Sequence, residues 1–173
     1  MRNSLQNQKV WIDMLIPFEE MPDNARLWIY QADRKLGDEE VKFVEANTES
    51  FLNQWQAHGQ DLKASFSVEY DQFLIISVDE SFSQASGCSI DASVHLIKAL
   101  ENELKVSFMT TSQVAFLQEE EINLYPFNQL KSRVAEQTIT PQTLVFDNTV
   151  QNVAEFKSRW LKESGETWVK RYF

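Results

Sequence analysis

The side chains best suited to chemistry lie around the single cysteine of the chain, Cys88, in the segment 78–94 (VDESFSQASGCSIDASV). A thiol near the start of a helix forms a thiolate more readily, and a neighbouring imidazole acts as its base or ion-pair partner. His58 is the candidate base, with Asp79 or Glu80 to orient it. These residues predict a thiol-dependent hydrolase or transferase.

The same segment also allows an anion to bind without catalysis. Backbone N–H groups at the start of a helix carry partial positive charge and hold phosphate or carboxylate groups. Gly87 and Ser89 would supply such N–H groups, and Lys63 would add a full positive charge. This pattern predicts a site for a small anionic ligand.

Acidic residues allow a third chemistry at this place. Asp79, Glu80 and Asp91 bear oxygens that bind divalent cations or transfer protons. Adjacent carboxylates at the end of a strand are more often solvated, so we assign no metal ligands and expect no cofactor. A carboxylate-based metal enzyme remains an alternative.

The main candidates each have a structural alternative. Cys88 near a helix start can be a small buried apolar residue. His58 can cap the last carbonyl groups of the preceding helix, and Ser89 can cap the first N–H groups of the next. No complete catalytic signature is present, so we expect first a protein that binds a small anionic ligand or a protein partner without catalysis.

The elements that must position these residues alternate in a recognisable order. Strict alternation in ASFSVEY and a nearly continuous apolar run in FLIISV predict a hairpin of one half-exposed and one buried strand. The order is strand, helix, strand, strand, helix, strand, which is that of a ferredoxin-like βαββαβ core. The expected elements are a strand at 27–31, a helix from Asp38 to near Gly59, strands at 64–70 and 73–78, a helix at 89–104, and strand pieces at 106–109 and 113–117.

This topology makes the first and third strands central, and it brings candidate residues to one end of the sheet. We expect the following side chains to gather there: His58, Lys63, Asp79, Glu80, Cys88 and Ser89. A strand at 143–146 and helices at 127–135 and 150–161 would form a C-terminal elaboration that covers the sheet. We therefore predict an α+β sandwich of two or three layers, with residues 25–173 as one domain after a leading segment, 1–24.

The composition narrows the class of partner and the location. The 173 residues include 16 basic and 26 acidic side chains, and the formal net charge of −10 disfavours nucleic acid and anionic membranes as partners. One cysteine cannot form an internal disulfide, and no apolar run approaches the ~20 residues of a membrane span. We expect a cytoplasmic protein, as a monomer or as a homodimer formed through the edge strand 64–70.

Four segments together resemble a known family: 25–36 (ARLWIYQADRKL), 55–66 (WQAHGQDLKASF), 78–94 and 168–173 (WVKRYF). The family consists of small, uncharacterised proteins from the Bacteroidetes, whose members often carry the label "ABC transporter ATPase". The likeness runs from about Met14 to the C-terminus, which makes Met14 an alternative initiator. The resemblance implies no catalytic or binding residues for this chain.

The label can be tested against the residues themselves. ATP hydrolysis by an ABC protein requires a phosphate-binding loop of the form GxxxxGK[ST]. None of the four glycines, Gly37, Gly59, Gly87 and Gly165, is followed by lysine. The chain therefore lacks a Walker A motif, and we expect no ABC-type ATPase activity.

Overall fold

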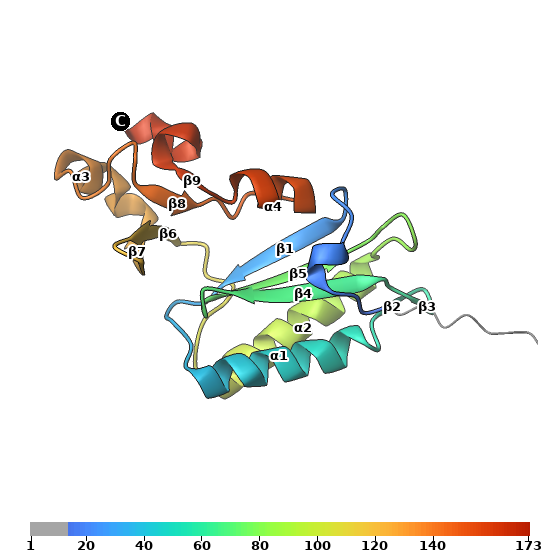
Figure 1. Cartoon of the computed structure of the whole chain (residues 1–173). Helices are drawn as coiled ribbons and strands as arrows, with labels where there is room; N and C mark the ends of the chain where they lie inside the picture. Colours follow the sequence, from blue (N-terminus) through green and yellow to red (C-terminus); the bar gives the residue numbers. More distant parts are fainter. Residues whose placement is uncertain (1–13) are drawn as a thin grey trace, which may run out of the picture.

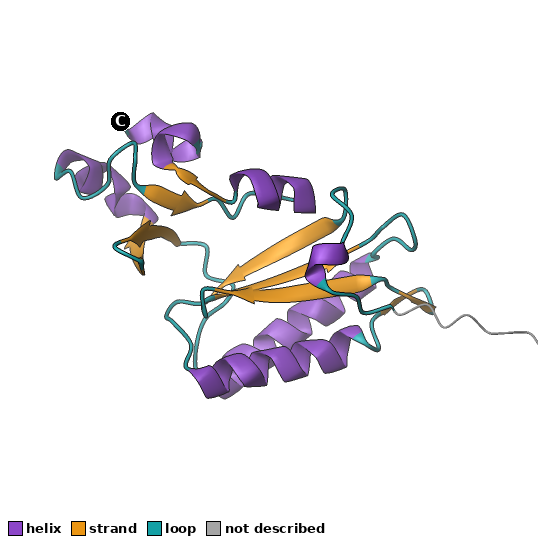
Figure 2. Cartoon of the chain, in the orientation of Figure 1, coloured by secondary structure: helices purple, strands orange, loops and turns teal. Residues whose placement is uncertain are grey.

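Two larger antiparallel sheets, with helices against each, and one small two-stranded hairpin form the fold of the computed structural model over the residues that it describes (Figures 1 and 2). The structure describes residues 14–173, so residues 1–13 of the predicted leading segment lie outside the described residues. Within the remainder of that segment, η1 (Phe18–Glu20) is a short 3-10 helix, and Leu15 forms an isolated bridge with Ala64. The class is mixed α+β.

The first sheet has the strand order β1-β5-β4, with β1 (Arg26–Gln31), β4 (Ala64–Glu69) and β5 (Phe73–Val78). All six residues of the central strand β5 are buried and five of them are apolar, the exception being Ser77, as expected for a strand covered on both faces. On one face its side chains join a core with the two long helices, and on the other they join a core with the second sheet. Both faces of this sheet are therefore covered.

The two long helices, α1 (Asp38–Leu52) and α2 (Gly87–Leu104), lie side by side on one face of the first sheet (Figure 1). The predicted extension of the first helix to near Gly59 is wrong. Beyond α1 the chain forms a small hairpin of β2 (Gln56–Ala57) and β3 (Gln60–Asp61). The two residues between these strands both have positive φ, a conformation that matches the twist of a two-residue hairpin turn.

The second sheet has the order β7-β6-β8-β9 and is built from the C-terminal third of the chain. Its strands are β6 (Gln113–Gln118), β7 (Glu121–Pro126), β8 (Leu144–Phe146) and β9 (Leu161–Glu163). Short helices accompany it: η2 (Phe127–Gln129), α3 (Leu130–Ala135), α4 (Val153–Arg159), η3 (Ser164–Glu166) and η4 (Trp168–Tyr172). The strands β7 and β9 and the shortening of α4 from the expected 150–161 are corrections to the sequence prediction.

The ferredoxin-like topology is not confirmed. The order β1-β5-β4 agrees with its first three strands, but its fourth strand would pair with the outer edge of β1. The residues expected there form β6, which is hydrogen-bonded to β7 on one side and β8 on the other. Both edges of β6 are thus occupied, and β1, predicted to be central, is an edge strand of its sheet.

The segment 106–109, also expected to be a strand, is an irregular loop. A carboxylate oxygen of Glu101 in α2 accepts hydrogen bonds from the backbone N–H groups of Phe108 at 2.6 Å and Met109 at 3.0 Å. These N–H groups are therefore satisfied by a side chain and do not need a neighbouring strand. Glu101 fixes the path of this loop.

Three hydrophobic clusters give the molecule more layers than the predicted two or three. The first joins α1 and α2 to the first sheet. The second joins the two sheets to each other through Phe73, Ile75, Ala115 and Phe146. The third lies on the far face of the second sheet and includes Leu130 and Val169 of the C-terminal helices. The order is helices, sheet, sheet, helices.

The start of α1 yields a testable pH effect. Both carboxylate oxygens of Glu40 accept hydrogen bonds from Arg34, at 2.7 and 2.8 Å, and one also accepts from the Gly37 N–H at 2.8 Å. Arg34 first, and then the Gly37 bond, lower the pKa of Glu40 from 4.5 to about 2. A lowered folded-state pKa stabilises the fold above pH 4.5, and this contribution disappears as the pH falls toward 2.

We expect Arg34→Ala to raise the pKa of Glu40 toward 4.5 and to reduce this acid-linked loss of stability. An NMR titration of the Glu40 carboxyl carbon in both proteins measures the shift. Lys42→Ala, which removes the cation paired with Glu39 on the same helix, is the matched control. An unchanged Glu40 titration in Arg34→Ala would contradict the assignment.

Candidate functional site

One part of the predicted cluster forms at the end of the first sheet. The Lys63 ammonium lies 3.8 Å from a carboxylate oxygen of Asp79, and the Asp79 N–H donates to the Lys63 carbonyl at 2.8 Å. The other Asp79 oxygen accepts from the N–H and hydroxyl of Ser81, at 3.1 and 2.5 Å. Asp79 is buried, and these bonds make it a structural anchor of the turn after β5.

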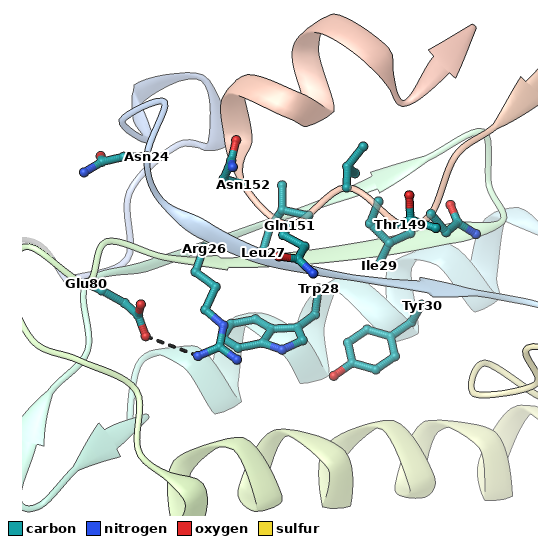
Figure 3. A pocket seen from close by; sticks show the side chains of 12 residues that line it. Asn24, Arg26, Leu27, Trp28, Ile29, Tyr30, Glu80, Thr149, Gln151 and Asn152 are labelled. Atoms are coloured by element: carbon teal, nitrogen blue, oxygen red, sulfur yellow. Dashed lines mark ion pairs between the residues drawn. The ribbon is translucent and has the colours of Figure 1, made fainter. Parts of the chain in front are cut away.

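Glu80 forms an ion pair with Arg26 and not with Lys63. Its carboxylate lies 3.5 Å from the guanidinium of Arg26 at the start of β1, and that guanidinium covers the ring of Trp28 at 4.7 Å from its centroid (Figure 3). Glu80 therefore belongs to a group on β1 that the sequence analysis did not single out.

Cys88 and His58 belong to different elements, α2 and the β2–β3 turn. Cys88 is exposed in the first turn of α2, and His58 is exposed in the turn between β2 and β3. Within residues 14–173 no hydrogen bond joins them. The expected helix-capping role of His58 is wrong, since α1 ends before it. A Cys88–His58 catalytic pair remains a prediction from the sequence.

The start of α2 is closed by its own residues. Ser86 is the N-cap, and its hydroxyl oxygen accepts from the Ser89 N–H at 3.2 Å. The Ser89 hydroxyl in turn accepts from the Ser86 N–H at 2.7 Å. Ser89 is buried, and its carbonyl accepts from the indole of Trp55 at 2.8 Å. The N–H of Ser89, expected to bind an anion, thus donates to the N-cap hydroxyl of Ser86, whereas Gly87 is exposed at the first position of α2.

Among the described residues, Asp79, Glu80 and Asp91 do not form a common set of metal ligands. Asp79 and Glu80 have the partners described above, and Asp91 is exposed on α2. In the part of the chain that the structure describes, no group of three or more His, Cys, Asp or Glu side chains is placed to hold a metal ion.

A polar cavity of about 670 Å³ lies along β1 beside the Arg26–Glu80 pair (Figure 3). Arg26, Trp28 and Tyr30 point to the side of β1 that α2 covers. Burial raises the pKa of Tyr30, partly offset by a hydrogen bond with Ser93. The remaining wall is rich in amide side chains and is formed by Asn24, Leu27, Ile29, Glu80, Asn148, Thr149, Val150, Gln151 and Asn152.

A second cavity, of about 650 Å³, lies at the other end of β1 and is largely apolar. It is bordered by β1, the loop 108–111, β6, η2, the end of β8 with the loop that follows it, and η4. Its apolar wall consists of Ile29, Tyr30, Phe108, Met109, Val114, Phe127, Phe146 and Trp168, and its polar groups come from Gln31, Thr110, Thr111, Gln113, Asn148, Thr149 and Arg171. A pocket of this size, mostly apolar with a few polar groups, is typical of small-molecule sites.

Arg171 is the only full charge on this wall. Its guanidinium lies 5.3 to 5.7 Å from the ring centroids of Phe127, Trp168 and Tyr172. Phe127 and Trp168 stack, with centroids 5.5 Å apart and planes inclined by 15°. Among residues 14–173 no carboxylate lies within ion-pair distance of Arg171. The aromatic rings position the guanidinium, and no carboxylate of the described residues neutralises its charge.

The residues of this cavity come from distant parts of the chain, so no local pattern in the sequence predicts it. One signal is present in the sequence: aromatic and basic residues gather in 168–173. In the structure Val169 is fully buried in the third hydrophobic cluster, while Arg171 and Phe173 are exposed. This segment therefore both closes a core and presents a cation.

These features define a mixed α+β protein with two ligand-sized cavities along one edge strand. Comparisons of the chain with protein-family models, with curated proteins and with solved structures find no match. The resemblance to the Bacteroidetes family remains a prediction. Within the described residues, no helix has the length and apolar character that a membrane span requires.

Proposed function

We propose that this protein binds a small organic anion with an apolar body, without catalysing a reaction, in the apolar cavity beside β1. The observation that carries the proposal is Arg171, whose charge has no acidic partner among the described residues and stands at the wall of that cavity. A carboxylate, sulfonate or phosphate would receive charge-assisted hydrogen bonds from its guanidinium.

The rest of the cavity fits the other end of such a ligand. Burying an apolar body against the rings of Phe108, Phe127 and Trp168 contributes roughly 25 cal/mol for each Å² removed from water. The chain as a whole carries a charge of −10, which opposes the approach of any anion. A local cation is therefore needed for an anion to bind here.

A pair of dyes tests the proposal. 1-Anilinonaphthalene-8-sulfonate (ANS) and N-phenyl-1-naphthylamine (NPN) share their apolar rings, but only ANS has a sulfonate. We expect Arg171→Ala to weaken ANS binding about tenfold and to change NPN binding less than about twofold, because it removes a hydrogen bond to a charged group. Fluorescence titration of each dye gives the two dissociation constants.

Lys170→Ala is the matched control, since Lys170 is the neighbouring exposed cation and does not line the cavity. It should leave both dyes unaffected, and thermal melting should show that both variants fold. Equal weakening of ANS and NPN in Arg171→Ala, or equal effects of the two substitutions on ANS, would refute the anion site.

A further inference from the structure

The outer edge of β1 is partly paired and then opens. The Leu27 N–H donates to the Gln151 carbonyl at 3.0 Å, and the Val153 N–H donates to the Ala25 carbonyl at 3.0 Å. In a continued antiparallel ladder, the next bond would run from the Gln151 N–H to the Leu27 carbonyl. The Gln151 N–H donates instead to the carboxylate of Glu155 at 2.8 Å. The ladder therefore stops after one residue pair.

Backbone N–H groups alternate in direction along a strand, and this alternation identifies the groups of β1 that remain unpaired on its outer edge. Ala32 donates its N–H across to Gln72, beside β5, whereas Leu27 donates away from β5. Ile29 and Gln31 share the outward direction of Leu27. Within the described residues, the N–H groups of Ile29 and Gln31 have no hydrogen-bond partner. The next outward N–H, that of Asp33, donates to the Ser107 carbonyl at 2.9 Å.

The surroundings of this open edge match an extended polypeptide. Both cavities border it, and they share Ile29, Tyr30, Asn148 and Thr149 as lining residues. A peptide laid along the edge would thus find room for side chains toward each end of the strand. The one charged residue of β1, Arg26, is paired with Glu80, so the strand itself carries no unpaired charge; the unpaired Arg171 of the neighbouring cavity belongs to η4. The chain as a whole has a net charge of −10. An acidic peptide is disfavoured by that overall charge, and a neutral one is not.

We propose that a neutral, extended segment of a partner protein adds to the first sheet as a strand along β1, pairing with the outward backbone groups of Ile29 and Gln31. Such strand addition gives affinity through main-chain hydrogen bonds and specificity through alternate side chains. The occupant takes the position that a fourth strand would have in a ferredoxin-like sheet. This inference goes beyond the proposed anion site, because it uses backbone groups of β1 and does not need Arg171.

The probes are three peptides, acetyl-Thr-Val-X-Val-Thr-amide with X as Val, Asn or Glu, each also made fully N-methylated. We expect the Val and Asn peptides to shift the amide signals of Ile29 and Gln31 in ¹⁵N–¹H spectra and, near saturation, to slow their hydrogen exchange at least tenfold. The Glu peptide should bind more weakly. The N-methylated peptides keep the side chains but cannot donate hydrogen bonds from their backbones. They should neither shift the amide signals of Ile29 and Gln31 nor slow the hydrogen exchange of these amides.

Ile29→Pro removes an outward N–H without removing a bond to β5, and it should abolish peptide binding. Val68→Pro is the matched control, because by the same alternation its N–H points outward from the opposite edge of this sheet.

The proposal fails if neither unmodified neutral peptide affects Ile29 and Gln31, or if the N-methylated peptides act equally. It also fails if these amides become protected with rising protein concentration alone, which would place a second copy of the chain there. Dye binding tests the anion site separately, so either proposal can fail alone.

Discussion

Replacing Phe73 by alanine is expected to lower the free energy of unfolding by about 3–5 kcal/mol, the range found when a buried phenylalanine is truncated. Phe73 is fully buried on β5, and its ring contacts Phe146 at 4.7 Å and Trp160 at 5.1 Å between centroids. These two aromatic residues come from the second half of the fold. The substitution therefore removes packing that holds the two sheets together.

Chemical denaturation, followed by tryptophan fluorescence and by far-ultraviolet circular dichroism, measures this loss. Phe82→Ala is the control, since Phe82 is 50% exposed and should change the free energy by less than ~0.5 kcal/mol. If the sheets fold as one unit, the two signals change together in the wild type and in the variant. A Phe73→Ala protein with unchanged stability would show that the core between the sheets contributes little.

The second large effect concerns Asp147, in the loop between β8 and α4. One of its oxygens accepts from the N–H and hydroxyl of Thr149, at 3.1 and 2.5 Å, and the other accepts from Arg159 at 2.9 Å. The Asp147 side chain is only 4% exposed. Asp147→Ala leaves these donors without their acceptor, and we expect a loss of about 2–3 kcal/mol in stability, together with weaker ANS binding because Thr149 lines the apolar cavity.

Asp147→Asn should recover part of the stability, because its amide oxygen can still accept from Thr149. Asp23→Ala is the control: Asp23 forms an ion pair with Lys157 at 2.9 Å but is 72% exposed, so its loss should cost less than ~0.5 kcal/mol. Equal losses in Asp147→Ala and Asp23→Ala would show that the buried bonds of Asp147 add nothing.

Local patterns in the sequence predicted most elements of the first half of the chain. The alternation before Tyr70 and the apolar run after it gave the hairpin of β4 and β5, and the periodic apolar residues gave α1 and α2. The end of α1 was predicted too late because Trp55 continues the apolar spacing of the helix. In the structure Trp55 lies beyond the end of α1, and its indole N–H donates to the carbonyl of Ser89. Spacing alone cannot distinguish these two uses of a buried ring.

The candidate site was less predictable than the elements. Lys63 and Asp79 were predicted to lie at the same end of the sheet, and the structure joins them. The partner of Glu80 was not predicted, because Arg26 is 54 positions away and no local pattern links the two residues. The apolar cavity combines residues from β1, the loop after α2 and the C-terminus, and such a combination has no signature within any one segment.

The sequence by itself determined the mixed class, the strands and helices with strong periodicity, the net charge and the absence of a Walker A motif. These follow from properties of neighbouring residues. Only the tertiary structure decided that β6 joins a second sheet and leaves β1 at an edge. That choice depends on competition between distant strands for the same hydrogen bonds, and β6 satisfies its bonds with β7, its immediate hairpin partner, and with β8. The two cavities and the unpaired edge of β1 are consequences of that competition.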